Sequence, residues 1–176
     1  MATLFYGMNV SLDGHVDHDA FAPGPGLFRH FIEQTAGLAG SLYGRGLYGI
    51  MRYWDEDRAD WGPDERAFAA AWRAVPKWVA SATLEEVGPN ATLLGGDAVA
   101  AARRLKAERK GGIEVGGTVL ARALGEAGLI DEIRLYLHPV VTGGGTPFFA
   151  GWSPQLRLLS HEEMPGGVVL LRYAPS

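Results

Sequence analysis

The chain alternates short apolar segments with amphipathic ones, and this alternation predicts its secondary structure. Thr3–Val10 is almost wholly apolar, as is typical of a strand buried on both faces of a sheet. Gln155–His161 and Val168–Tyr173 flank a turn that contains Pro165 and two glycines, which predicts an antiparallel hairpin. The other predicted strands are Gly40–Tyr43, Trp78–Ser81, Ala91–Leu94, Ile113–Val115 and Glu132–Val141.

Helical spacing appears between these strands. Leu27–Thr35 repeats apolar residues every three or four positions, and Pro63–Ala74 opens with a proline followed by two acids. Asp97 is the predicted N-cap of an alanine-rich helix that reaches about Arg109, and Thr118 is the candidate N-cap of a later helix. The expected buried stripe of that later helix is Leu120, Ala123, Leu124 and Ala127, with Gly128 as its stop.

Strands and helices that alternate and end in a hairpin predict a three-layer α/β/α domain. Its sheet would be mixed and mostly parallel, with an antiparallel edge at the C-terminal hairpin. No internal repeat or linker interrupts the pattern, so residues 1–176 are expected to form one domain. Tyr53–Gly62 is charged and tryptophan-bearing, and is expected to be a surface excursion.

Composition narrows the functional classes. The 176 residues are 47% hydrophobic and 20% charged, as in an ordinary globular domain, and the net charge of -4 makes nucleic acid a poor partner. The absence of cysteine excludes disulfides, cysteine nucleophiles, thiolate zinc sites and iron–sulfur clusters. The N-terminus lacks the basic start of a signal peptide, and no apolar run is long enough to span a membrane, so a soluble, cytoplasmic protein is expected.

Two glycine clusters are candidate nucleotide sites. Gly44–Gly49 matches G-x-G-x-x-G, but the acid expected about 20 residues later would fall at Asp64 or Glu65, which open a helix. A true dinucleotide fingerprint is therefore not favoured. Gly116–Gly117 lies between a strand and a helix start, where free backbone N–H groups suit a pyrophosphate. A plain tight turn explains the same residues.

The loop after the first strand gathers acids and histidines. Its members are Asp13, His15, Asp17, His18 and Asp19. A calcium loop would need glycine where His18 stands, and a zinc site would need further ligands, so a solvated polar loop is favoured and no metal site is expected. The hydrolase motif G-x-S-x-G and the Walker A motif are both absent.

Several motifs form an ordered set along the chain. They are Ser11–Gly14 (SLDG), Gly44–Arg45 with Tyr48, Ser81–Leu84 (SATL), Val115–Leu120 (VGGTVL), Ala127–Leu135 (AGLIDEIRL), and Pro139–Val141 with Gly143–Phe149 (GGGTPFF). The set closely resembles the dihydrofolate-reductase-like superfamily, and within it the reductase domain of bifunctional riboflavin-biosynthesis deaminase–reductases. The resemblance covers nearly the whole chain, and its most specific part runs from Val115 to Phe149.

The resemblance implies an NADPH-dependent reductase. By analogy, Asn9, Val10 and Gly14 would line the nicotinamide region, and Gly44 and Arg45 would hold phosphates. The adenosine ribose and its 2′-phosphate would meet Ser81, Ala82 and Thr83. The pyrophosphate would be wrapped by Gly116, Gly117, Thr118, Val119 and Leu120. The family also implies a homodimer.

The substrate half departs from both related groups. Riboflavin reductases carry a D-N-P-x-L-T-x-R stretch where this chain has Leu47–Trp54, and dihydrofolate reductases carry an acid on the first helix, where Glu33 is the nearest acid. Candidate substrate residues are His15, Phe28, Glu33 and Tyr48. The zinc-binding deaminase half is absent, since its P-C-x-x-C motif needs cysteine.

These observations support a reductase similar to 5-amino-6-(5-phosphoribosylamino)uracil reductase, acting on a small heterocyclic, carbonyl or imine substrate. Dihydrofolate reductase-like activity and a non-catalytic nucleotide-binding protein are the alternatives. Asp13 is the candidate catalytic residue because it follows the strand beside the expected nicotinamide site, although a loop-capping role would explain it equally well. Phe148, Phe149 and Trp152 are three rings in a glycine-rich connection, and they are expected at or near the homodimer interface.

Overall fold

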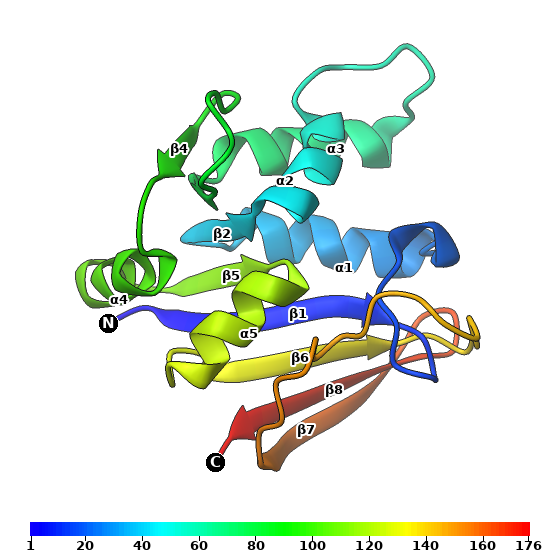
Figure 1. Cartoon of the computed structure of the whole chain (residues 1–176). Helices are drawn as coiled ribbons and strands as arrows, with labels where there is room; N and C mark the ends of the chain where they lie inside the picture. Colours follow the sequence, from blue (N-terminus) through cyan, green and yellow to red (C-terminus); the bar gives the residue numbers. More distant parts are fainter.

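A computed structural model describes residues 1–176, which form one eight-stranded sheet with helices on both faces (Figure 1). The strand order is β4-β3-β2-β5-β1-β6-β8-β7. All neighbours from β4 to β6 are parallel, and β8 pairs antiparallel with both β6 and β7. The strands are β1 (Thr3–Val10), β2 (Gly40–Gly44), β3 (Lys77–Ala80), β4 (Ala91–Leu94), β5 (Gly112–Gly116), β6 (Glu132–Leu137), β7 (Leu156–Met164) and β8 (Val168–Pro175).

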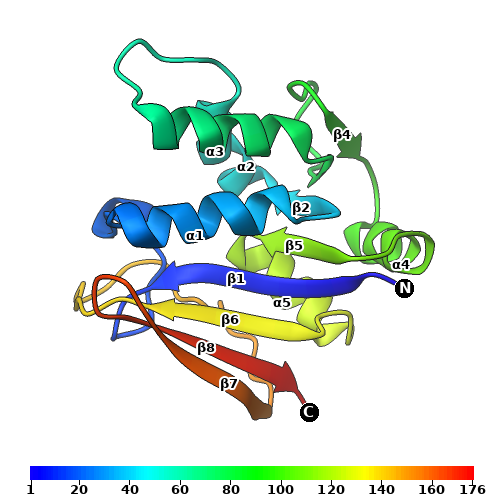
Figure 2. The ribbon, with the colours of Figure 1, turned by 180° about the vertical axis from the view of Figure 1, so that it is seen from behind.

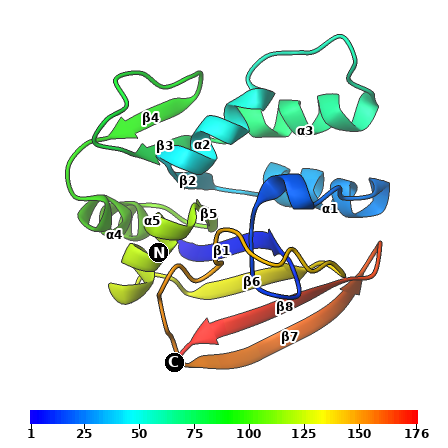
Figure 3. The same cartoon turned by 45° about the vertical axis from the view of Figure 1, so that its right-hand side comes forward.

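Two helical layers cover the sheet. Helices α4 and α5 lie on one face, and α1 and α3 lie on the other (Figures 1 and 2). The helices are α1 (Pro25–Ala36), α2 (Arg45–Met51), α3 (Pro63–Ala74), α4 (Ala98–Glu108) and α5 (Thr118–Glu126), with short 3-10 turns at η1 (His18–Ala20) and η2 (Arg52–Trp54). The predicted three-layer α/β/α architecture and its C-terminal antiparallel hairpin are confirmed (Figure 3).

The central strand β1 shows why both faces must be covered. Leu4 and Tyr6 are fully buried in the core that α5 closes, together with Ile113 of the neighbouring strand. Side chains alternate across a strand, so the residues between them face α1. That second face contains Gly7 and Asn9, and it forms the floor of the cavity described below.

Two predicted boundaries were wrong for local reasons. Gly117, at φ +105°, is the N-cap of α5, and Thr118 is instead its first helical residue, without a side-chain cap. Strand β6 ends at Leu137 rather than Val141, because its pairing with β8 stops there and the chain turns at Pro139. The buried stripe of α5 contains Ala121 in place of Ala123.

The aromatic connection after β6 belongs to the core. Phe148 is 1% exposed and packs on the ring of Tyr6, whose hydroxyl donates to the Phe148 carbonyl at 2.8 Å. Trp152 is 8% exposed and lies against Gly125, where an added Cβ would come within 2.4 Å of its ring. Phe148 and Trp152 therefore complete the core of the monomer, which was the alternative to a place at the interface.

The segment from Tyr53 to Gly62 is only partly a surface excursion. Trp61 is buried and donates its indole N–H to the Tyr53 hydroxyl, and Asp55 accepts from the Trp72 indole at 3.0 Å. The charged residues between them are exposed. None of the helices combines the length and apolar character needed to cross a membrane.

Candidate functional site

A cavity of about 270 Å³ opens on the α1 face of the sheet. Its floor is formed by strands β2, β5, β1 and β6, and its walls come from α1, α2, α3 and the loop after β1. The lining residues are Gly7, Met8, Asn9, Val16, His18, Phe21, Pro23, Phe28, Phe31, Gln34, Thr35, Tyr43, Leu47, Ile50, Met51, Trp54, Phe68, Trp72, Glu114, Gly116 and Tyr136. This set is mostly apolar, as is usual for a small-molecule site.

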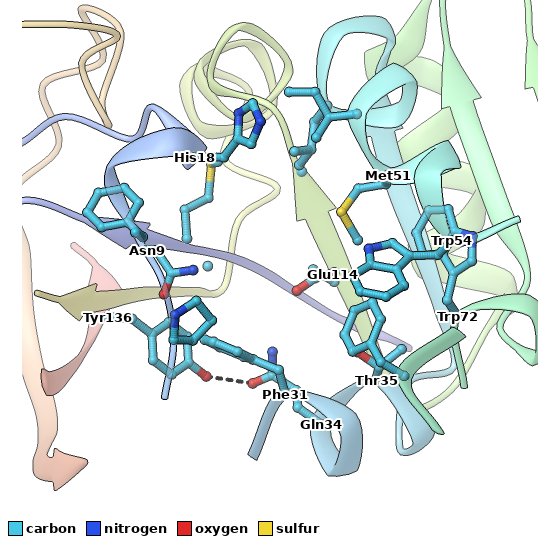
Figure 4. A pocket seen from close by; sticks show the side chains of 18 of the residues that line it. Asn9, His18, Phe31, Gln34, Thr35, Met51, Trp54, Trp72, Glu114 and Tyr136 are labelled. Carbon is cyan, nitrogen blue, oxygen red and sulfur yellow. Dashed lines mark hydrogen bonds between the residues drawn. The ribbon is translucent and has the colours of Figure 1, made fainter. Parts of the chain in front are cut away.

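Figure 4 shows two contrasting walls. One is polar and contains Asn9, Gln34 and Tyr136, and the other contains Met51, Trp54 and Trp72. The rings of the aromatic wall pack against one another. The rings of Phe28 and Phe68 stack at 5.5 Å, and Trp54 lies 4.7 Å from Phe68. Flat rings held by their neighbours in this way favour a flat ligand.

Glu114 lies between these walls (Figure 4) and is the one carboxylic acid of the lining. It belongs to β5, where Ile113 and Val115 point to the opposite core. The Tyr43 hydroxyl donates to Glu114 Oε2 at 2.8 Å. Burial raises the pKa of Glu114, while the Tyr43 hydrogen bond and the charge of Arg134 act in the opposite direction.

A hydrogen-bond chain fixes the polar wall. Gln34 Oε1 accepts from the Tyr136 hydroxyl at 2.7 Å and from Arg134 at 3.2 Å. His30 Nε2 lies 2.9 Å from the same hydroxyl, and burial raises the pKa of Tyr136 to about 12. On the floor, Asn9 Oδ1 is 2.8 Å from His138 Nε2, and burial lowers the pKa of His138. His138 therefore orients the Asn9 amide toward the cavity.

A backbone cradle adjoins the cavity. A Cβ placed on Gly117 would lie 3.6 Å from both Cα and N of Gly44, so two chain segments meet here with no side chain between them. Gly44 ends β2, and Gly117 follows the parallel neighbour β5, which explains why their carboxyl ends coincide. Since the N-terminus of α5 has no side-chain cap, its first backbone N–H groups are available to an anion.

The remaining predicted cofactor residues surround this cradle. Val119 is 77% exposed on the first turn of α5, while Leu120 is buried in the core. Arg45 is exposed and lines a shallow hollow together with Arg52 and Leu84. That hollow adjoins the turn after β3, where the Ser81 hydroxyl accepts from the backbone N–H groups of Thr83 and Leu84, and where Ala82 and Thr83 are exposed.

The loop after β1 makes the capping contacts that were the alternative interpretation of Asp13, and its catalytic role stays a prediction. Asp13 accepts hydrogen bonds from the backbone N–H groups of Thr142 (3.1 Å) and Gly143 (2.8 Å), and His15 lies 3.1 Å from the Thr142 hydroxyl. The Gly14 carbonyl accepts from the N–H of Phe148. Hydrogen bonds from Ser11 and from these backbone groups lower the pKa of Asp13. Asp13, Gly14 and His15 thus tie two loops together outside the cavity lining.

Of the remaining predicted substrate residues, some line the cavity and others lie outside it. Phe28 lines the cavity, but Glu33 is exposed on α1, where Gln34 and Thr35 face inward instead. Tyr48 is buried, and its hydroxyl accepts from the backbone N–H of Gly88 at 2.7 Å, which makes it an anchor for the loop after β3. The Val10 side chain points into the opposite core.

Glu114 and, apart from Phe28, the aromatic wall were missed by the sequence interpretation. A signal for Glu114 was present, since a lone acid between Ile113 and Val115 in a short, buried parallel strand is unusual and calls for a reason. Trp54 and Trp72 carried no such signal, because their helical spacing is equally typical of ordinary core residues. No group of three or more histidine, aspartate or glutamate side chains is placed to hold a metal ion.

Comparison with known proteins identifies relatives in sequence and in fold. The sequence is 28% identical to the uncharacterized protein YyaP of Bacillus subtilis (strain 168) over 98% of this chain and 91% of that one. A putative riboflavin biosynthesis protein from Shewanella sp. PV-4 superposes with a TM-score of 0.72 at 21% identity, covering 100% of this chain and 99% of that chain.

Two further solved structures share the fold. A deaminase/5-amino-6-(5-phosphoribosylamino)uracil reductase from Thermotoga maritima has a TM-score of 0.69 at 15% identity, and the match covers 99% of this chain and 57% of that chain. Dihydrofolate reductase from Enterococcus faecalis, complexed with NADP(H), has a TM-score of 0.67 at 14% identity over 99% of this chain and 96% of that chain.

The family model of the RibD C-terminal domain matches residues 2–170, almost the whole chain. The resemblance drawn from the ordered motifs is confirmed by this match. The chain belongs to the RibD C-terminal domain family.

Proposed function

We propose that this protein is a reductase that uses NADPH to reduce a small unsaturated substrate held in the cavity. The observation that carries the proposal is the continuity of two sites through adjacent residues. Gly116 lines the cavity, and Gly117 meets Gly44 in the backbone cradle. A molecule that rests its phosphates on the cradle would extend directly into the cavity.

The residues of the cradle fit a dinucleotide. Gly44 and Gly117 carry no side chain that would keep phosphate oxygens away from the backbone, and the uncapped start of α5 supplies backbone donors. Arg45 presents a guanidinium suited to a further phosphate in the neighbouring hollow. When bound, NADPH would supply the hydride from its nicotinamide ring. Family membership and the NADP(H) complex of the dihydrofolate reductase neighbour support this choice.

The residues of the protein would orient the substrate and exclude water from the cavity. The Asn9 amide, held by His138, lies on the cavity floor where a polar ring substituent could be oriented. The aromatic wall would keep water from the reacting carbon while holding a planar substrate against the nicotinamide. The substrate of the Thermotoga neighbour carries a ribosyl phosphate, but neither lysine nor arginine lines this cavity. We therefore propose a riboflavin-reductase-like reaction on a substrate without that phosphate.

Titration calorimetry with NADPH, followed by loss of NADPH absorbance with a panel of carbonyl and imine substrates, tests the proposal. Binding together with turnover is the expected result. Binding without turnover across the panel would favour the alternative, a nucleotide-binding protein without catalysis. Absence of NADPH binding would overturn the proposal.

Arg45 offers a sharper test of cofactor choice. Arg45→Ala is expected to weaken NADPH binding by about tenfold and to leave NADH binding nearly unchanged, because a charge-assisted hydrogen bond contributes about 1.5–3 kcal/mol. Arg103→Ala on α4 is a matched control, since that residue is exposed and away from the cradle. An equal loss for both cofactors would assign Arg45 to the pyrophosphate instead.

A further inference from the structure

We infer that the cavity takes a flat aromatic substrate that carries neither phosphate nor carboxylate and presents a basic N–H group to Glu114. This inference rests on the proposed function, which assigns hydride transfer without assigning the molecule that accepts it. It follows from the charge of the lining, from the free oxygen of Glu114 and from the shape of the walls.

The lining contains neither lysine nor arginine, and its one basic side chain, His18, is exposed and lies 3.0 Å from Asp19 Oδ1. Arg134 is the basic residue whose charge acts on Glu114, yet its guanidinium is bound to Glu132 at 2.7 Å and stacks 3.7 Å above the Phe5 ring. Lys77 is buried below α3 and donates to the carbonyls of Trp72 and Val75. An anionic ligand would lose its hydration here without gaining a lysine or arginine counter-ion, which disfavours its binding.

Glu114 has one oxygen still to be satisfied. Oε2 accepts from Tyr43, whereas Oε1 has no hydrogen-bond partner within the chain. Every fully buried side-chain polar atom of the protein does have a partner, so Oε1 is open to the cavity. Burial raises the pKa of this carboxyl despite the Tyr43 hydrogen bond and the charge of Arg134, so its charged form would gain from a further donor. A ligand N–H, positively charged or made acidic by its ring, would supply that donor.

The walls select for a flat molecule. Phe28 and Phe68 are nearly parallel, with 22° between their planes, and Trp54 and Trp72 extend the same apolar surface beside Glu114 (Figure 4). Aromatic faces attract a cationic ring through their negative π surface, in addition to its hydrophobic burial. A carboxylate together with aromatic faces is therefore complementary to a heteroaromatic amine.

Three probes of one shape test the inference by titration calorimetry without NADPH. They are 2-aminoquinoline, 2-methylquinoline and quinoline-2-carboxylate. The amine is expected to bind at least tenfold more tightly than the methyl compound, and the carboxylate is expected not to bind measurably. Glu114→Gln should weaken amine binding at least tenfold and leave methyl binding within about twofold. Glu163→Gln, on exposed β7, is the control of equal charge change.

Each other outcome overturns the inference. These outcomes are no amine binding, equal affinity for all three probes, preference for the carboxylate, or amine binding that Glu114→Gln leaves unchanged. NADPH binding measured on the same samples separates the two proposals. If NADPH binds and the amine does not, the substrate class fails and the cradle stands. If the amine binds and NADPH does not, the reductase proposal fails.

Discussion

Glu114 and Gly117 are three residues apart, yet each illustrates a different cost that the site imposes on the fold. Glu114 places a carboxyl among aromatic rings, where the charged form is poorly solvated. Gly117 holds a backbone conformation that other residues rarely adopt. Both costs can be measured from the thermal stability of variants, because replacing either residue changes the free energy of unfolding in a predictable direction.

Glu114→Gln is expected to raise the melting temperature at pH 7. The folded-state pKa of Glu114 lies above its ordinary value of 4.5, so folding loses stability as the pH rises above that value. The neutral amide avoids this loss and still accepts from Tyr43. Melting curves from pH 4 to pH 8 should show the advantage of the variant growing with pH. A difference that stays constant over this range would contradict the assignment of a buried, titrating carboxyl.

Gly117→Val should weaken NADPH binding at least tenfold. The substitution forces a β-branched residue to φ +105° and fills the gap beside Gly44, with a strain of about 1–3 kcal/mol. Gly96→Val is the control, because Gly96 also has positive φ, at +76°, but lies in open space after β4. Similar destabilisation with normal NADPH affinity is expected for the control. Normal affinity in folded Gly117→Val would show that the cradle does not hold the cofactor.

At the scale of elements, the local sequence patterns were sufficient to predict the bounds of some helices and strands. The bounds of β1, α3 and β4 match the predicted segments, because each is defined by its own run of apolar residues or its own opening proline. Asp97 also caps α4 as predicted, accepting from the N–H groups of Val99 and Ala100. The cavity was not predictable in this way. Its walls come from α1, α2, α3 and four strands, so no single segment carries its pattern.

The contacts between the loop after β1 and the connection after β6 were also not predictable from local sequence patterns. The acids after β1 were recognisable, but their partners are about 130 residues away in the connection after β6, where Thr142, Gly143 and Thr146 donate to Asp13 and Asp17. Figure 1 shows the two loops side by side beyond the ends of β1 and β6. Sequence spacing could not distinguish a catalytic acid from one that holds a distant loop.

Asp13→Asn is expected to loosen the connection after β6 rather than to stop catalysis. The amide retains one acceptor oxygen where the carboxylate now serves two backbone N–H groups. Hydrogen exchange at Thr142 and Gly143 should become faster, and kcat should fall less than tenfold. Asp19→Asn is the control, since Asp19 is exposed and is paired with His18. A hundredfold loss of kcat with unchanged exchange would restore Asp13 as a catalytic residue.

On the scale of the whole molecule, the homodimer stays a prediction, and its expected location changes. Phe148 and Trp152 are buried and Phe149 is half-buried, whereas β7 is the edge strand of the sheet and is exposed along most of its length. Leu158 and Leu159 are 49% and 45% exposed beside a register shift in the β7–β8 pairing. Exposed edges of this kind invite pairing with a second copy, so we propose β7 as the contact.

Light scattering at micromolar concentration is expected to give the mass of a dimer. Leu159→Lys should convert it to a monomer, because a lysine on the edge strand opposes pairing. Leu12→Lys is the control, since Leu12 is 57% exposed in the loop after β1. A monomer mass for the unmodified protein would end the proposal, and a dimer that survives Leu159→Lys would place the interface elsewhere.

The aromatic wall also gives the protein an internal optical reporter. Of its five tryptophans, Trp54 and Trp72 line the cavity, while Trp61, Trp78 and Trp152 do not. Indole emission depends on the polarity around the ring and is quenched by an acceptor nearby. A reduced nicotinamide that enters beside Gly116 would therefore quench Trp54 and Trp72 most strongly, because they lie nearest to it. Quenching that is smaller in the double variant Trp54→Phe and Trp72→Phe would follow occupancy of the cavity in real time without any label.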